Sequence, residues 1–340
     1  MDQLPFRCAI SVVASIVRAF VPPALLLMLV GPALAGSVKL AWNPVTSPPA
    51  AGYKIHYGTA AGNYPSQIDV GNVTSYAVTG LTEGTTYHFV VSAYASGYAD
   101  SGFSNDVASA AHPDLGLYRK TAGATKPPYR FMLDYNVDHA PDAQVQYGGA
   151  GDIALVGKIA PGGMSSLIYY RNGMWNIDNN RDGTTDTVVG FGGVPGDIPL
   201  AANFSGPGQL DDLVIYRNGM WYVDTDLNGI ANLTYTFGGV PGDKPLAGDV
   251  NGDGIADLVI YRNGVWYVDT NRNGIADQTY YFGGLPQDIP ALFDWDGDGK
   301  ADLCIYRDGM WYISTKRDGV ADVIFSYGTA GDLPLQGTFH

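Results

Sequence analysis

The chain has almost no glutamate and very little cysteine. Glu83 is the single glutamate among 33 acidic residues, so the negative charge is carried by aspartate, a residue that favours turns and caps over helix interiors. A mostly helical fold is therefore not expected. Cysteine occurs only at Cys8 and Cys304, and because Cys8 lies in a predicted leader, the mature chain can form no intrachain disulfide. Cys304 is expected to pack as a small apolar side chain.

Basic residues are also scarce, and they form no run. The 19 lysines and arginines stand against 33 acids and leave a formal net charge of −14. A chain of this sign cannot neutralise phosphate groups, so we expect no nucleic-acid partner and no binding to anionic membranes. A cationic partner such as a metal ion fits the charge better.

Long hydrophobic runs are missing beyond the first 35 residues. The apolar run 24–30 follows Arg18, and Ala33-Leu34-Ala35 supplies the small-x-small pattern of a cleavage site. We predict that residues 1–35 are a signal peptide, that the mature protein has no membrane span, and that it is secreted, at the cell surface or periplasmic. The alternative is an uncleaved anchor that also uses residues 8–17, but Arg18 interrupts it.

The chain is rich in the residues of short strands and tight turns. It contains 45 glycines, 21 prolines, 23 tyrosines and 6 tryptophans, a composition typical of all-β proteins. Within residues 36–112, apolar and polar side chains alternate in the segments 38–42, 53–57 and 87–94. A period of two predicts half-buried strands, so this part is expected to be a small all-β module.

Three features of this module resemble a fibronectin type III domain. They are Trp42, the segment 52–58, and the run Leu81-Thr82-Glu83-Gly84-Thr85-Thr86-Tyr87. The resemblance implies a β-sandwich over residues 36–112, with Tyr87 in the tyrosine corner of the family. Almost nothing precedes the Trp42 strand, so the first edge strand is expected to be short or missing. Such modules act as spacers or adhesive units, and no ligand site is carried over.

From residue 151 onward the sequence repeats with a period of about 45 residues. Each unit opens with Gly-Asp or Gln-Asp and continues with an apolar strand ending in Tyr-Arg, a turn, a strand that begins with tryptophan, and a last strand near Phe-Gly-Gly. Four strands per unit is the pattern of a β-propeller blade. The predicted units are 151–195, 196–241, 242–286 and 287–330.

The middle hairpin of the unit 242–286 can be registered from its turn. Asn263-Gly264 favours a two-residue type I′ turn, because both positions need positive φ. Apolar or aromatic partners would then lie on both faces, as a blade packed between two neighbours requires. The predicted cross-strand pairs are Arg262 with Val265, Tyr261 with Trp266, Ile260 with Tyr267 and Val259 with Val268.

The two ends of the repeat region complement each other. Residues 331–340 supply one strand of a unit, and residues 115–150 look like a unit that lacks this strand. Together with the four whole units, they predict a β-propeller over residues 113–340. It would have five blades, the last of them closed by the C-terminal strand, which removes the open sheet edge.

Two aspartate-rich loops between the first and second strands of their units have the spacing of a calcium ligand set. Oxygen-bearing side chains occupy positions 1, 3, 5 and 9 (position 3 is an asparagine in one loop), a glycine at position 6 allows a sharp bend, and the carbonyl of position 7 contributes. We therefore predict calcium as the cofactor. The predicted ligands are Asp249, Asn251, Asp253, Ile255 and Asp257 in the first loop and Asp294, Asp296, Asp298, Lys300 and Asp302 in the second. Neither loop has glutamate at position 12, so neither is an EF-hand.

A second series of acidic loops follows the tryptophan strand of each unit. Its best calcium set is Asp178, Asn180, Asp182 and Asp186, with less complete sets beginning at Asp134, Asp224 and Asp269. The alternative is that these residues are aspartate and asparagine turns that satisfy their own backbone. No metal is expected at 158–165 or 203–212, where the first-series pattern has decayed.

The repeat array resembles the FG-GAP repeats of integrin α-subunits and their bacterial relatives. The resemblance rests on Phe-Gly-Gly near the unit ends and on Asp-Val-Asn-Gly-Asp-Gly at residues 249–254. It implies a calcium-bearing propeller used in extracellular recognition. Integrin propellers have seven blades, a departure from this chain, so no partner surface is carried over.

These features favour an exported, non-enzymatic, calcium-binding adhesion or recognition protein whose partner is an extracellular protein or a glycan. One alternative is a lectin, in which the repeated tryptophans would be sugar-stacking platforms. Their pairing with tyrosine instead favours a role in the blade core. Repeated arginines either hold an anion or pair with aspartates. A polysaccharide hydrolase or lyase is a further alternative, but nearly every aspartate is explained by a repeat position, so no catalytic residue is predicted. The tryptophans are Trp175, Trp221, Trp266 and Trp311.

Overall fold

The protein is described by a computed structural model. It covers residues 10–12, 35–46, 49–82, 85–110, 114–120, 129–135, 137, 139–161 and 164–337. All regular elements in these ranges are β-strands, so the predicted all-β class is confirmed. Among the described residues no helix is long and apolar enough to cross a membrane. The chain divides into two compact units, of which the first holds β1–β7 and the second β8–β27.

The first unit consists of two antiparallel sheets that enclose one core. Leu40 and Val78 from one sheet pack with Ile55 and Phe89 from the other, and all four side chains are fully buried. This is the two-layer arrangement of a β-sandwich. One sheet has the order β1 (Ile10–Val12), β2 (Ala35–Trp42), β5 (Ser75–Thr82), and the other β4 (Ser66–Gly71), β3 (Gly52–Gly58), β6 (Thr86–Tyr94), β7 (Val107–Ala110).

Two details of this sandwich bear on the sequence predictions. The hydroxyl of Tyr87 accepts a hydrogen bond from the backbone N–H of Thr82 at 3.2 Å, the upstream contact expected of a tyrosine corner. The first edge strand is present as β1, which pairs with β2 so that Ile10 lies opposite Trp42. It is short, with only three residues. β1 falls inside the predicted signal peptide, so in the full chain part of that segment forms a strand of this sheet. Cleavage after Ala35 stays a prediction.

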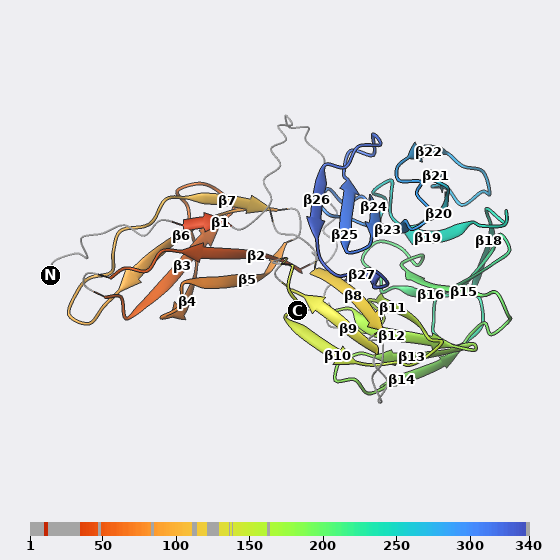
Figure 1. The fold of residues 1–340 in the computed structure, drawn as a ribbon, viewed down its shortest axis with the longest axis horizontal. Coiled ribbons are helices and arrows are strands. Elements are labelled where there is room, and N and C mark those ends of the chain that lie inside the picture. Colours follow the sequence, from red (N-terminus) through yellow and green to blue (C-terminus); the bar gives the residue numbers. More distant parts are fainter. Residues whose placement is uncertain are drawn as a thin grey trace. The chain divides into compact units, whose positions relative to one another are not determined.

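The second unit is built from five four-stranded antiparallel sheets (Figure 1). Four of them follow the predicted repeat units. In order along the sheet they are β11 (Ile153–Gly157), β12 (Ser166–Arg171), β13 (Met174–Asp178), β14 (Thr187–Gly190); β15 (Ile198–Ala202), β16 (Asp212–Arg217), β17 (Met220–Asp224), β18 (Leu233–Thr236); β19 (Lys244–Gly248), β20 (Asp257–Arg262), β21 (Val265–Asp269), β22 (Gln278–Tyr281); and β23 (Ile289–Phe293), β24 (Asp302–Arg307), β25 (Met310–Ser314), β26 (Val323–Ser326).

The fifth sheet joins the two ends of the repeat region. Its strand order is β27 (Leu333–Gly337), β8 (Asp114–Lys120), β9 (Tyr129–Asp134), β10 (Ala143–Gln146). The C-terminal strand pairs antiparallel with β8, with Leu335 opposite Gly116. The first strand of each sheet also contacts the first strand of the next, in the cycle β11, β15, β19, β23, β27 and back to β11. The arrangement of the second unit is therefore propeller-like (Figure 1).

The central hairpins have the predicted register. The pairs Arg262 with Val265 and Tyr261 with Trp266 are both observed, as are the two further pairs predicted in β20 and β21. The turn residues have the positive φ values that a type I′ turn needs, +50° at Asn263 and +86° at Gly264. In the next sheet, β24 carries Cys304, which is fully buried and lies opposite Ala291 of β23, as expected of a small apolar side chain.

The four repeated tryptophans belong to the core. Trp175, Trp221, Trp266 and Trp311 are all 0% exposed, and the indole N–H of each donates a hydrogen bond of 2.9–3.0 Å to a backbone carbonyl 16 residues later. A sugar ring cannot stack on a side chain without accessible surface. The idea that these tryptophans form a lectin platform is therefore wrong.

The repeated arginines are paired within their sheets. Each binds the aspartate of the unit's opening dipeptide, which is almost fully buried. The pairs are Arg119 with Asp332, Arg171 with Asp152, Arg217 with Asp197, Arg262 with Asp243 and Arg307 with Asp288. A guanidinium that already holds a carboxylate is neutralised, so these arginines are not a free anion-binding ring.

Candidate metal centre

The two predicted calcium loops connect the first and second strands of neighbouring sheets, β19 to β20 and β23 to β24. In the second loop, the carboxylate at position 1, Asp294, accepts hydrogen bonds from the backbone N–H groups of Gly297 at 2.7 Å and Gly299 at 2.8 Å. Asp249 receives the same two bonds in the first loop, at 2.6 and 2.7 Å. The glycine at position 6 has φ near +82° in both loops, which an L side chain rarely adopts. The predicted sharp bend is therefore present.

The carboxylate at position 9 is the buried end of each loop. Asp257 and Asp302 both begin the second strand of their sheets and are both 0% exposed. One carboxylate oxygen of each, Oδ2, accepts the backbone N–H of position 2, from Val250 at 2.8 Å and from Trp295 at 2.9 Å. A buried carboxylate lowers the stability of the fold unless each of its oxygens has a partner. Whether the loop needs a bound cation therefore depends on the partner of the second oxygen, Oδ1.

The side chain at position 3 determines that partner. In the loop 203–212, which is one residue longer, Ser205 donates its hydroxyl to Oδ1 of Asp212, the first residue of β16, at 2.8 Å. In the loop 249–257, the amide of Asn251 donates to Oδ1 of Asp257 at 3.3 Å. In the loop 294–302, position 3 is Asp296, and a carboxylate offers only acceptor atoms.

Oδ1 of Asp302 consequently has no hydrogen-bond partner although it is fully buried. Ligand oxygens of Asp294, Asp296 and Asp302 lie within 4.8 Å of one another, the one cluster of this kind found among the described residues. Burial raises the pKa of Asp302 to about 8 and that of Asp294 to about 6, and repulsion between the neighbouring carboxylates adds to both shifts. Carboxylate oxygens grouped in this way are ligands that suit calcium.

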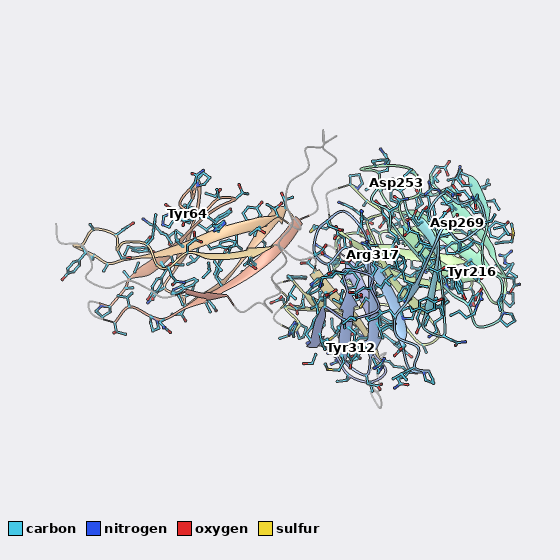
Figure 2. The ribbon with its side chains drawn as sticks, turned by 90° about the horizontal axis from the view of Figure 1, so that it is seen from above. Tyr64, Tyr216, Asp253, Asp269, Tyr312 and Arg317 are labelled. Atoms are coloured by element: carbon cyan, nitrogen blue, oxygen red, sulfur yellow. The ribbon has the colours of Figure 1, made fainter. Side chains whose placement is uncertain are left out.

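The first loop is a less complete version of the same arrangement. Burial raises the pKa of Asp257 to about 7 and also raises that of Asp249. The amide nitrogen of Asn251 lies between the carboxylates of Asp253 and Asp257, at 3.2 and 3.3 Å, and so supplies part of the positive charge that a cation would bring. For a cation to bind here, this amide must turn its oxygen inward. Asp253 lies in this loop and is labelled in Figure 2.

Two predicted ligands contribute only main-chain atoms. The backbone N–H groups of Ile255 and Lys300 donate to the position-5 carboxylates of their loops, Asp253 and Asp298, each at 2.9 Å. These bonds fix the peptide at position 7 at the bend of the loop. The carbonyls of Ile255 and Lys300 stay the predicted ligands.

Neighbouring first-series loops are also tied together through the backbone. The N–H of Ala301 donates to the carbonyl of Asp249 at 2.5 Å, and the N–H of Ala256 donates to the carbonyl of Asn203 at 2.7 Å. A Cβ built on Gly252 would lie 3.1 Å from the side chain of Lys300, so the loop 294–302 rests on the loop 249–257. The two candidate sites therefore form one continuous edge of the second unit.

Arginines near both sites were missed by the sequence reasoning. Arg317 approaches Oδ1 of Asp302 at 3.5 Å, and Arg272 approaches Oδ1 of Asp257 at 3.9 Å. Both come from second-series loops, where arginine occupies position 4 (Arg317 is labelled in Figure 2). The recurrence of arginine at this position in three units was the available signal, but its contact partner could not be read from the sequence.

The second-series set Asp178, Asn180, Asp182 and Asp186 is engaged by its own loop. Asp178 accepts the N–H groups of Arg181 at 2.6 Å and Gly183 at 2.8 Å, and Asp186 accepts that of Asn179 at 2.7 Å. Among the described side chains, these three aspartates do not meet as a cluster of the kind formed at Asp294. The geometry is that of aspartate turns, and calcium at this loop stays a prediction.

Comparison with known proteins gives a family for one segment. The fibronectin type III domain model matches residues 28–109. A Kelch domain-containing protein of Saccharolobus solfataricus is 55% identical over 64 residues, which make up 18% of this chain and only 8% of that protein. The chain thus spans a small part of this relative's length, and the FG-GAP resemblance of the repeat array stays a prediction.

Solved structures give only a distant likeness. A lectin from Agrocybe aegerita, described as recognising non-reducing terminal N-acetylglucosamine, is 12% identical, with 83% of this chain and 91% of that chain covered and a TM-score of 0.37. Glutaminyl cyclase of Myxococcus xanthus is 10% identical, with 48% and 67% covered and a TM-score of 0.35. At TM-scores below 0.5, we assign neither a ligand nor an activity to this chain from these structures.

Proposed function

We propose that this chain is an exported, non-enzymatic recognition protein whose second unit is a closed five-bladed propeller stabilised by calcium. The five four-stranded sheets would be its blades, and the sheet of β27 and β8–β10 would close the ring. The fibronectin type III-like unit would act as a spacer or adhesive module. Its partner would be an extracellular protein or a glycan.

The observation that carries the calcium proposal is the buried Oδ1 of Asp302, which has no hydrogen-bond donor. Asp294, Asp296, Asp298 and Asp302, with the carbonyl of Lys300, would hold the ion. Calcium would neutralise these carboxylates and tie the end of β23 to the start of β24. The second site would be formed by the corresponding residues of the loop 249–257 after rotation of the Asn251 amide.

Isothermal titration of calcium into the full chain tests this proposal. Wild type should bind calcium, and Asp302→Asn should lose the stronger site, because the amide removes a charged ligand and brings its own donor. The matched control is Asp308→Asn, since Asp308 is an exposed turn residue in the same unit and asparagine occupies its place in other units. Equal titrations for wild type and Asp302→Asn would contradict the site.

A surface for a protein partner is suggested by three exposed aliphatic side chains. Ile230, Ile275 and Val320 follow the position-6 glycine of three consecutive second-series loops and are 69%, 70% and 63% exposed. Contiguous exposed apolar surface marks interaction sites, and these three side chains would contribute to one such surface. Replacing all three by serine should abolish capture of the extracellular partner while leaving the melting temperature unchanged, and undiminished capture would exclude this surface.

Glycan binding is the second candidate, favoured by an exposed aromatic group in the first unit. Phe103 is 45% exposed. Its ring centroid lies 4.7 Å from that of His56 and 5.7 Å from that of Tyr64. Asp106 accepts a hydrogen bond from the hydroxyl of Tyr64 at 2.7 Å. An aromatic face beside a carboxylate can stack on a sugar ring and bind its hydroxyls. A glycan array comparing wild type with Phe103→Ala tests it (Tyr64 is labelled in Figure 2).

A further inference from the structure

Three second-series loops place an arginine on the first-series loop of their own unit. Arg181, Arg272 and Arg317 occupy position 4 of these loops, with φ values of +61°, +58° and +56°. The side chain of each donates a hydrogen bond to the backbone carbonyl 16 residues earlier, at 3.4, 3.0 and 3.1 Å. The acceptor is in each case the residue immediately before position 9 of the first-series loop, namely Ser165, Ala256 and Ala301.

The three arginines share this contact but face different charges. Arg317 Nη2 lies 3.5 Å from Oδ1 of Asp302 and 4.0 Å from Oδ1 of Asp298. Arg272 approaches one carboxylate, Asp257, at 3.9 Å. Arg181 has Ser166 at the corresponding place, and it forms no ion pair within the described part of the chain.

Of the two arginines that face carboxylates, Arg317 has the more deeply buried side chain. Its side chain is 13% exposed, against 17% for Arg272. Its Nη2 is buried without a hydrogen-bond partner, as is Oδ1 of Asp302. The guanidinium and the carboxyl oxygen therefore face each other at 3.5 Å without forming a hydrogen bond, a weak contact that a better ligand can replace.

We propose that Arg317 is the counter-ion of the loop 294–302 in its cation-free state and that it sets the calcium affinity of this loop by competing for Asp302. The inference rests on the calcium site proposed above and concerns its regulation. Arg272 has the same role for the loop 249–257, with a smaller effect because it is farther away and Asn251 already supplies a donor. Arg181 serves only to hold the loop backbone.

The competition follows from the fixed charge of arginine. A guanidinium stays protonated in proteins, so calcium entering the cluster meets a positive charge beside one of its ligands. Binding must displace the guanidinium or tolerate its repulsion. Removing the charge of Arg317 should therefore destabilise the calcium-free protein. The same change should make calcium binding tighter.

Four variants of the full chain test this inference by calcium titration calorimetry and by melting in the presence of a chelator. Arg317→Gln should bind calcium at least about fivefold more tightly, the lower end of typical coupling between sites, and should melt at a lower temperature without calcium. Arg272→Gln should show a smaller change in affinity. Arg317→Lys keeps the charge and should retain wild-type affinity within about twofold.

Arg181→Gln is the matched control. It loses the same backbone hydrogen bond, so it should lower the melting temperature without changing calcium affinity. The inference is overturned if Arg317→Gln binds calcium no more tightly than wild type, if Arg317→Lys behaves like Arg317→Gln, or if Arg181→Gln gives the same gain. Absence of calcium binding by wild type would instead overturn the proposed function, and this inference with it.

Discussion

Arg119 and Asp332 form the same ion pair across 213 residues of chain that Arg307 and Asp288 form across 19. In the distant pair, the guanidinium of Arg119 donates from Nε at 2.9 Å and from Nη2 at 2.7 Å to the two oxygens of Asp332. Both aspartates are almost fully buried. A contact that is local in the other units therefore joins the two ends of the repeat region in this one.

The first prediction compares these two pairs. Arg119→Met and Arg307→Met should each lower the free energy of unfolding by about 1–3 kcal/mol, between the values of exposed and buried ion pairs, because each leaves a buried carboxylate unpaired. Urea denaturation measures both. If the ends of the repeat region are joined as the pairing of β27 with β8 indicates, the two losses agree; a negligible loss for Arg119→Met alone would show that the distant pair is not formed in solution.

The second prediction concerns the strand that joins the ends. Truncation after residue 332 removes β27 and exposes the edge of β8, which carries unpaired backbone groups. We expect aggregation in size-exclusion chromatography and a lower, broader melting transition. A peptide of residues 333–340 added in excess should restore part of the stability, and a truncated chain that stays monomeric with an unchanged melting temperature would argue against this role of β27.

The third prediction is the pH dependence of one ion pair. Burial opposes the charged form of Asp288, but Arg307 and two backbone N–H groups outweigh it and hold the pKa of this carboxyl below its ordinary value. A lowered pKa means stability that is present above the ordinary value, near pH 4, and lost as the pH falls through the folded value. The difference in unfolding free energy between wild type and Asp288→Asn should therefore shrink between pH 5 and pH 2.

Denaturant titrations at several pH values measure this difference. Asp308→Asn is the control for the general effect of removing a carboxylate, because Asp308 is an exposed turn residue. A difference for Asp288→Asn that stays constant over this range would contradict the assignment of the pair as the source of acid sensitivity.

The fourth prediction exchanges the residues at position 3 of the two calcium loops. Asn251→Asp removes the donor to Oδ1 of Asp257 and adds a charged ligand, so calcium affinity of the loop 249–257 should rise about tenfold, since ligand charge tunes affinity in such loops. Asp296→Asn should lower the affinity of the loop 294–302 by a similar factor. Calorimetry with both variants measures the exchange, and parallel rather than opposite changes would refute the role given to position 3.

Much of the fold could be predicted because it rests on local and repeated signals. The turn Asn263-Gly264 alone fixed the register of β20 with β21, since only one pairing is compatible with a two-residue turn. The complementary lengths of the chain ends predicted the pairing of β27 with β8. These inferences need no knowledge of side-chain contacts between distant residues.

The site could be predicted only in part, because its chemistry depends on contacts outside the loop. The spacing of Asp294, Asp296 and Asp302 indicated an oxygen cluster, and these three side chains do come together. The approach of Arg317 could not be foreseen, because it depends on how two loops of one unit pack. By contrast, the pairing of Trp266 with a tyrosine favoured a core position, and Trp266 does lie in one buried cluster with Leu303 and Ile305 of the neighbouring sheet.

The central claim is that a cation binds among Asp294, Asp296 and Asp302, and terbium luminescence tests it most directly. Trp295 lies between two of the ligands in the sequence, so its excitation should sensitise Tb³⁺ bound in this loop. The account predicts strong sensitised emission that calcium displaces, that falls sharply in Trp295→Phe, and that is lost from this loop in Asp302→Asn. Emission that is no stronger than that of free Tb³⁺, or that is the same in wild type, Trp295→Phe and Asp302→Asn, would contradict it.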